Sequence, residues 1–193
     1  MKTKQSLMLI TAFMTFGLLS CNTHVDNKKV AEKINDQKFS NTKLGKDADF
    51  VVESYNTGLF EIKAAELAQT KGLSPAIKKM AEEIKTDHTK LNSDLASLAT
   101  NKGITLPVDL SADFKTKYER LSGLTGKDFD EKYANMMVDG HKDAISAFEK
   151  ESKEGVDADI KGLAGKTITL LNNHLKMAQE VKQNVKNEVS QTK

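Results

Sequence analysis

The sequence predicts an all-α protein: an antiparallel four-helix bundle with a short extra helix between the second and third long helices. Apolar residues recur at steps of three and four along four long segments, and no segment alternates in the manner of a strand. The two prolines, Pro75 and Pro107, lie only at segment boundaries. A repeat of about 3.5 residues on long helices joined by short turns is typical of such bundles.

The expected helices cover residues 47–70, 74–101, 112–122, 125–153 and 157–188. The first ends before Gly72, and Ser74-Pro75 then supplies an N-cap and a proline at the first helical position. Thr125 with Asp128 resembles a capping pair that opens the third long helix. Turns therefore separate all the predicted helices.

The N-terminus has the layout of a bacterial lipoprotein signal. Lys2 and Lys4 precede an uncharged run from Leu7 to Leu19, which is too short for a spanning helix of about 20 residues. Leu18-Leu19-Ser20-Cys21 then matches a lipobox, and Cys21 is the only cysteine. We expect lipidation of Cys21 and a protein that is lipid-anchored to a membrane of the bacterial cell envelope, with a periplasmic bundle. The alternative is an ordinary signal peptide with a coincidental cysteine.

Four regions follow from this interpretation. Residues 1–20 form the signal peptide, 21–46 the acylated N-terminus and a flexible tether, 47–188 the bundle and 189–193 a polar tail. The tether is predicted because residues 22–46 are polar with scattered apolar positions. A short helix around 30–38 is the alternative, and it would bury little.

Charge and cysteine content exclude several functions. Two of the 29 basic residues precede Cys21, so the mature chain has 27 basic and 27 acidic residues. Nucleic-acid binding is not expected, because it needs an excess of basic residues and Arg120 is the single arginine. A single cysteine also excludes an internal disulfide.

Three histidines occupy core positions near the middle of three different predicted helices: His88, His141 and His174. Glu61 lies beside the apolar stripe of the first long helix. Helical bundles build metal sites from inward-facing side chains, and imidazole suits zinc, iron and copper. The hypothesis is a transition-metal site with these four residues as ligands. A hydrogen-bonded polar core layer is the alternative.

Nearby residues refine the hypothesis. Asp87 and Asp139 are candidates to orient an imidazole, or are solvated residues flanking the stripe. Met137 and Met177 share helical faces with His141 and His174, which would favour copper, although methionine is also a common filler of cores. The paired Glu-x-x-His motif of di-iron bundles is absent.

No motif predicts an enzyme. The chain has no Gly-x-Ser-x-Gly elbow and no glycine-rich phosphate loop. The function classes left are a metal-binding envelope lipoprotein and, as the alternative, a non-catalytic envelope interaction or stress-related structural protein. The sequence leaves the protein partner and the oligomeric state open.

The chain resembles the bacterial domain-of-unknown-function family 4142. The matching pieces cover about residues 48–182 and comprise Phe50-Val51, Glu61-Ile62, Leu67-Ala68, Asp87-His88 with Asn92 and Leu95, Lys102-Gly103, Leu106-Pro107, Phe129-Asp130 with Tyr133, Met137-Val138 with His141, and His174. The family's second histidine typically follows an aspartate, whereas this chain has Asp139-Gly140-His141. The resemblance implies a ferritin-like helical fold in the cell envelope and no defined activity.

Overall fold

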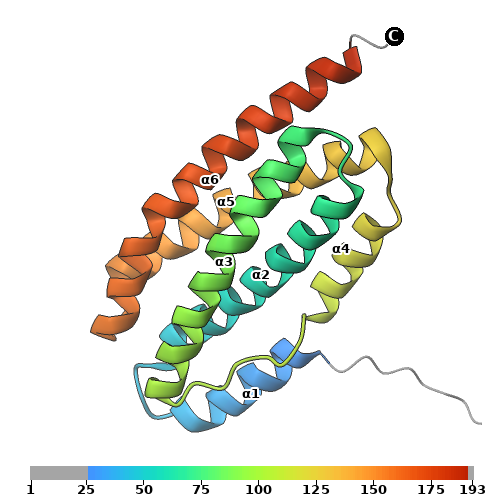
Figure 1. Ribbon diagram of the computed structural model, residues 1–193. Helices are drawn as coiled ribbons and strands as arrows, with labels where there is room; N and C mark the ends of the chain where they lie inside the picture. The colour runs from blue at the N-terminus through green and yellow to red at the C-terminus, as the bar shows by residue number, and fades with distance from the viewer. Residues whose placement is uncertain (1–25, 191–193) are drawn as a thin grey trace, which may run out of the picture.

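The protein is all-helical in the region that the structure describes. The computed structural model describes residues 26–190, with side chains to residue 187, and holds six helices and no strand in that range. They are α1 (Asn27–Phe39), α2 (Gly45–Lys71), α3 (Pro75–Lys102), α4 (Ala112–Ser122), α5 (Gly126–Glu154) and α6 (Ala158–Ser190) (Figure 1). The all-α prediction is confirmed, and the predicted bounds of α2 to α6 are right to within two residues. The predicted signal and Cys21 lie outside the described residues.

The four long helices form two hairpins. Residues 72–74 join α2 to α3, and residues 155–157 join α5 to α6. The hairpins pack on each other through contacts of α2 with α5 and of α3 with α6, while α4 lies against α2 and α5 (Figure 1). This pairing places the middles of all four long helices close together.

The predicted flexible tether is wrong for most of its length, because residues 27–39 form helix α1 and pack on α2. Asp26 caps the helix by accepting from the backbone N–H groups of Lys28 and Lys29. Ala31, Asn35 and Phe39 recur every four residues and are buried. Asn35 also bonds both the N–H and the C=O of Thr105, at 2.8 and 2.9 Å. The three buried residues are too few and too mixed in polarity to stand out in a polar sequence.

Two aspartates tie the hairpins together at their ends. Asp130 of α5 accepts from the N–H groups of Leu73 and Ser74, at 3.0 and 2.7 Å, where α3 begins. Asp47 of α2 accepts from the N–H groups of residues 156 and 157, at 2.9 and 2.7 Å, where α6 begins. A carboxylate at a helix N-terminus satisfies free N–H groups and complements the helix dipole. Ser74 and Thr125 take the predicted N-cap positions, but neither makes a side-chain cap bond.

The apolar core has two clusters. One includes Phe60, Ile84 and Tyr133, and the other includes Val51, Leu95 and Phe148. Along α3, His88 follows Ile84 of the first cluster and precedes Leu91 of the second. His141 and His174 likewise each have a member of one cluster before them in sequence and a member of the other after them. A polar layer therefore separates the two clusters at mid-height.

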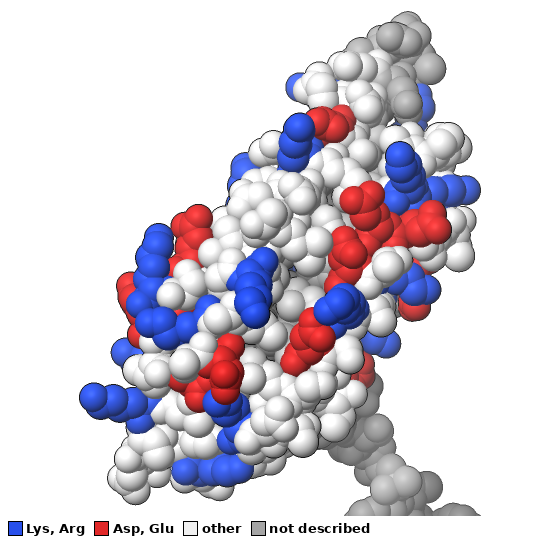
Figure 2. All heavy atoms as spheres, turned by 60° about the vertical axis from the view of Figure 1, so that its left-hand side comes forward, with Lys and Arg blue, Asp and Glu red and all other residues white. Residues whose placement is uncertain are grey.

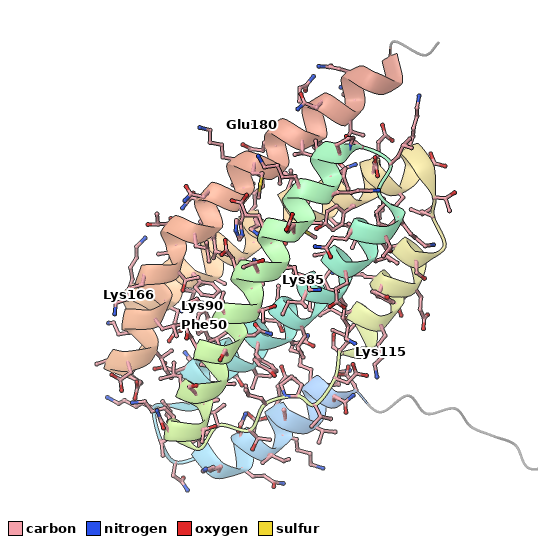
Figure 3. The ribbon with its side chains drawn as sticks, viewed as in Figure 1. Phe50, Lys85, Lys90, Lys115, Lys166 and Glu180 are labelled. Atoms are coloured by element: carbon pink, nitrogen blue, oxygen red, sulfur yellow. The ribbon has the colours of Figure 1, made fainter. Side chains whose placement is uncertain are left out.

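The outer surface carries both signs of charge. Lys and Arg are interspersed with Asp and Glu on the face in Figure 2. Lys90, Lys166 and Glu180 on the outward sides of α3 and α6 are exposed (Figure 3). No described helix combines the length and the apolar character that crossing a bilayer requires.

Candidate metal centre

Three helices bring the predicted histidines into one layer. His88 comes from α3, His141 from α5 and His174 from α6, and their exposed fractions are 3%, 0% and 1%. The ring centroids lie 5.3 to 5.5 Å apart in all three pairs. The rings thus form a nearly regular triangle, which the sequence alone could not establish.

Hydrogen bonds assign the tautomers of two rings. His141 Nδ1 lies 2.8 Å from the Met137 carbonyl oxygen, which can only accept, so Nδ1 carries the proton. His174 Nε2 lies 2.9 Å from Asp87 Oδ2, which places the proton of that ring on Nε2. The lone pairs of His141 Nε2 and His174 Nδ1 then face each other across 3.3 Å. A proton or a metal ion between them would turn this contact into a favourable one.

His88 completes the triangle with a nitrogen that has no partner. Its Nδ1 lies 2.9 Å from Glu61 Oε2, at an angle too oblique for a regular hydrogen bond. The carboxylate nevertheless favours a proton on Nδ1, which leaves a lone pair on Nε2. That Nε2 atom is buried and has no hydrogen-bond partner among the described residues. Such an unsatisfied polar atom in a core calls for an explanation.

The spacing of the nitrogens fits one metal ion. One ring nitrogen from each of the three histidines lies within 4.8 Å of the other two. Two nitrogens bound to one tetrahedral zinc ion at about 2.0–2.1 Å would lie roughly 3.3–3.4 Å apart. The His141–His174 pair already has that separation, at 3.3 Å. Small ring movements would bring the third nitrogen to the same distance.

Charges around the layer favour the ionised form of the Glu61 carboxylate. Burial raises the pKa of Glu61, but the neighbouring His88 and His141 outweigh it and lower that pKa to about 2. Burial lowers the pKa of His88, whereas Glu61 raises it and prevails. For His174, burial together with His88 and His141 lowers the pKa despite the bond to Asp87.

Of the three carboxylates predicted near the histidines, two contact the imidazole rings and one is exposed to solvent. Asp87 contacts His174 across helices, in the geometry by which carboxylates orient metal-binding imidazoles. Asp139 is exposed and makes no hydrogen bond or ion pair within the described part of the chain. Glu61 contacts Nδ1 of His88, and its other oxygen lies 3.6 Å from Nδ1 of His141. The carboxylate therefore lies on the outer side of two rings rather than among the three facing nitrogens.

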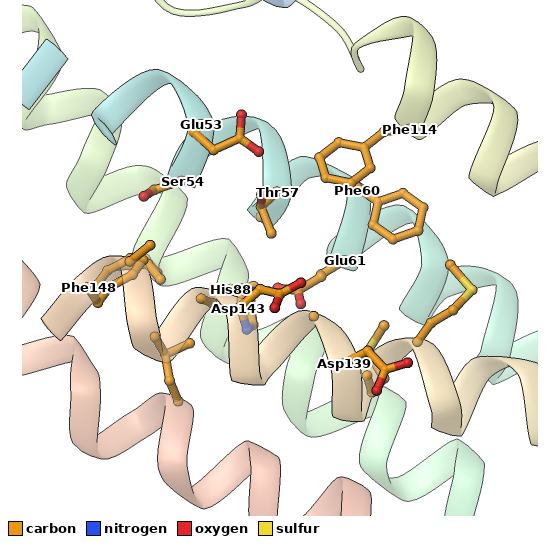
Figure 4. Close-up of a pocket in the computed structure, with 18 of the residues that line it drawn as sticks. Glu53, Ser54, Thr57, Phe60, Glu61, His88, Phe114, Asp139, Asp143 and Phe148 are labelled. Carbon is orange, nitrogen blue, oxygen red and sulfur yellow. Dashed lines mark ion pairs between the residues drawn. The ribbon is translucent and has the colours of Figure 1, made fainter. Parts of the chain in front are cut away.

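A cavity of about 390 Å³ reaches the layer from the surface. Apolar side chains such as Phe60, Phe114 and Phe148 make much of its wall (Figure 4). Glu61 and His88 also line it, whereas His141 and His174 do not. His88 is therefore the member of the triangle that faces the cavity.

Sequence reasoning missed two supports of the site. The Met137 carbonyl that holds His141 has no sequence signal, because every residue carries one. Asn92 is buried and donates to the Tyr55 carbonyl oxygen at 3.1 Å, while its own side-chain oxygen would lie 2.0 Å from a Cβ placed at Gly58. Gly58, three residues before Glu61 on α2, is thus a position where the two helices approach closely. A glycine within an apolar stripe was the available clue.

Comparison with known proteins places the chain in a family. Residues 32–181 match the family described as Domain of unknown function (DUF4142). The chain belongs to this family. Because the match includes half of α1, this DUF4142 domain extends N-terminal to the predicted bundle boundary at residue 47.

One solved structure shares the fold of this DUF4142 protein. It is the crystal structure of a DUF305 fragment from Deinococcus radiodurans, with a TM-score of 0.64 and 11% sequence identity. The alignment covers 72% of this chain and 95% of the other. At that identity the likeness concerns the helical fold alone. No curated protein matches the sequence.

Proposed function

We propose that this DUF4142 protein binds one transition-metal ion, namely zinc, iron or copper, through His88, His141 and His174. The observation that carries the proposal is that one ring nitrogen from each of three buried histidines lies within 4.8 Å of the other two. In each ring the other nitrogen faces a carbonyl or a carboxylate, which is the usual outer support of metal-binding histidines. A bound metal ion would lie between the facing lone pairs of His141 and His174, and it would give His88 Nε2 a partner.

Glu61 supports this proposal through charge. A divalent ion on three neutral imidazoles would place two positive charges in a dry core, and two carboxylates lie against the rings. Asp87 and Glu61 together balance that charge. Three protein ligands also leave a coordination position open, in the manner of reactive rather than purely structural zinc sites.

Metal analysis of the purified full chain tests the proposal. The chain would carry Cys21→Ser so that no thiol competes, and would be loaded separately with zinc, copper and, under anaerobic conditions, ferrous iron. We expect one ion per chain, and His141→Asn should weaken binding by about a hundredfold or more, because asparagine keeps a donor for the Met137 carbonyl but loses Nε2. His24→Gln removes a histidine that lies outside the described residues, and is the matched control.

Two outcomes would contradict metal binding. The first is a wild-type chain that retains no ion under any loading condition. The second is a His141→Asn variant that binds as tightly as the control. Either would leave the layer as a hydrogen-bonded polar layer of a non-catalytic envelope protein, which is the alternative function.

The cellular setting is part of the same proposal. We propose that Cys21 is lipidated, that the chain is anchored to an envelope membrane, and that the helices form a ferritin-like antiparallel four-helix bundle in the periplasm. The Lys2–Cys21 pattern supports the anchor, and the two packed hairpins support the bundle. Cys21→Ser should move the protein from the membrane fraction to the soluble fraction of lysed cells. Continued sedimentation with membranes would contradict the anchor.

A further inference from the structure

The cavity beside the candidate metal centre combines an apolar wall with an acidic mouth. Its wall includes Phe60 and Phe148, and its inner end is formed by Glu61 and His88. Asp139 and Asp143 also line it, one helical turn apart on α5 (Figure 4). The cavity therefore connects two exposed carboxylates to the side chain of His88.

Asp139 and Asp143 are placed at a cost to the helix. Both are exposed, and neither makes a hydrogen bond or ion pair with any described residue. Like charges four residues apart on a helix repel each other. Gly140 lies between them, and a Cβ there would meet Glu61 Oε1 at 3.5 Å, so the wall between the acids and the buried carboxylate is thin.

The other charges at this cavity are already engaged. Glu53 forms an ion pair with Lys28 of α1. The Lys117 ammonium lies 4.9 Å from the centroid of the Phe114 ring. That ring leaves the charge of Lys117 in place, but Asp139 and Asp143 have no ion-pair partner among the described residues and outnumber it, so the mouth carries excess negative charge. A low-dielectric wall focuses the field of such a pair along the cavity.

His88 provides independent evidence that this cavity serves a cation. It is 3% exposed, it lines the cavity, and its Nε2 has no hydrogen-bond partner in the described structure. The lone pair of a neutral imidazole nitrogen attracts a metal ion and repels an anion.

We propose that the cavity is the access route of the metal ion, in which Asp139 and Asp143 capture a hydrated divalent cation and pass it along Glu61 to His88. The proposal rests on metal binding at the three histidines. It adds that uptake is directional and occurs between α2, α4 and α5. The two acids raise the local cation concentration and do not belong to the final coordination sphere.

The test measures the kinetics of zinc uptake by the full chain carrying Cys21→Ser. Zn²⁺ is mixed rapidly with metal-free protein in the presence of a chromophoric zinc indicator, at about 10 mM and about 300 mM salt. The double variant Asp139→Asn/Asp143→Asn should slow association about three- to tenfold at low salt and lose most of the salt dependence. Dissociation should change less than twofold, because the bound ion lies at the histidines.

Two controls distinguish zinc uptake through the cavity from an effect of the overall charge of the protein. Glu131→Gln/Glu149→Gln removes two exposed acids from the same helix that do not line the cavity, and should leave the rates unchanged. Lys117→Gln removes the positive charge at the mouth, and should accelerate association. Thermal unfolding of each variant checks that the fold is retained.

The outcomes distinguish this proposal from the one on which it rests. Zinc binding with the same association rate in the Asp139→Asn/Asp143→Asn variant overturns the route and leaves the metal site standing. Equal slowing in the Glu131→Gln/Glu149→Gln control also overturns the route. Absence of zinc binding in the parent chain overturns both.

Discussion

Two buried glutamates of this protein have opposite electrostatic surroundings. Glu61 in the middle of α2 is 2% exposed, and Glu151 near the end of α5 is 8% exposed. The pKa of Glu61 is lowered to about 2, whereas that of Glu151 is raised to about 7. Burial pushes both pKa values upward, so the neighbours make the difference.

The neighbours differ in sign and in hydrogen bonding. Glu61 faces His88 and His141, and the attraction of these rings in their protonated form more than compensates for burial. Burial and the charge of Asp47 both raise the pKa of Glu151, and Lys161 and Lys150 offset them only in part. Its Oε1 atom has no hydrogen-bond partner among the described residues. The surroundings of Glu61 therefore stabilise its ionised form, whereas the surroundings of Glu151 stabilise its protonated form.

Removal of the Glu61 charge should give the largest effect. Loss of one partner from a buried ion pair costs about 3–5 kcal/mol, and Glu61→Gln keeps a polar side chain of the same size beside His88. We therefore expect the free energy of unfolding of the metal-free protein to fall by about 2–3 kcal/mol at pH 7. Urea unfolding followed by circular dichroism measures it.

Glu66→Gln is the matched control for that variant. Glu66 is an exposed residue of the same helix and pairs with Lys85 at 3.0 Å. An exposed pair contributes about 0–1 kcal/mol, so this variant should remain close to the parent. Equal stability of the Glu61→Gln variant and the parent would contradict the view that Glu61 is a charged partner of the histidine layer.

The contrast between the two glutamates also shows what sequence patterns can detect. Glu61 was a candidate from the sequence because it lies beside an apolar stripe and because three histidines occupy equivalent stripes. Helical periodicity carries that information directly. The sequence could not show that the rings share one depth, because depth depends on how the hairpins pack.

The burial of Glu151 and the docking of α1 were beyond sequence reasoning for a different reason, although the sequence offered a short helix around 30–38 as an alternative to the tether. In the sequence, Glu151 is one of several charged residues near the end of its helix. In the structure it lies close to Gly155 and near Asp47, which is over a hundred residues away in the chain. Helix α1 is polar overall, and its docking depends on the pairing of Asn35 with Thr105. Contacts between distant segments left no local signal in either case.

Removal of the Glu151 charge should give a smaller effect of opposite sign. Between pH 4.5 and about 7 the folded state holds a proton on Glu151 that the unfolded state has lost, so stability falls as pH rises through that window. Glu151→Gln has no such proton to lose. At pH 8 we expect the variant to be more stable than the parent by about 1–2 kcal/mol, and at pH 4 the two should be nearly equal.

Urea unfolding of the Glu151→Gln variant and its parent from pH 4 to pH 8 measures this difference. Glu149→Gln is the matched control, because Glu149 is exposed on the same helix and its distance of 3.9 Å from Lys153 makes at most a weak ion pair. A Glu151→Gln curve parallel to that of the control would contradict a raised pKa at Glu151. A gain that grows from about pH 4.5 to about pH 7 and then levels off would show that ionised Glu151 destabilises the junction of α2, α5 and α6, whereas ionised Glu61 stabilises the layer of histidines.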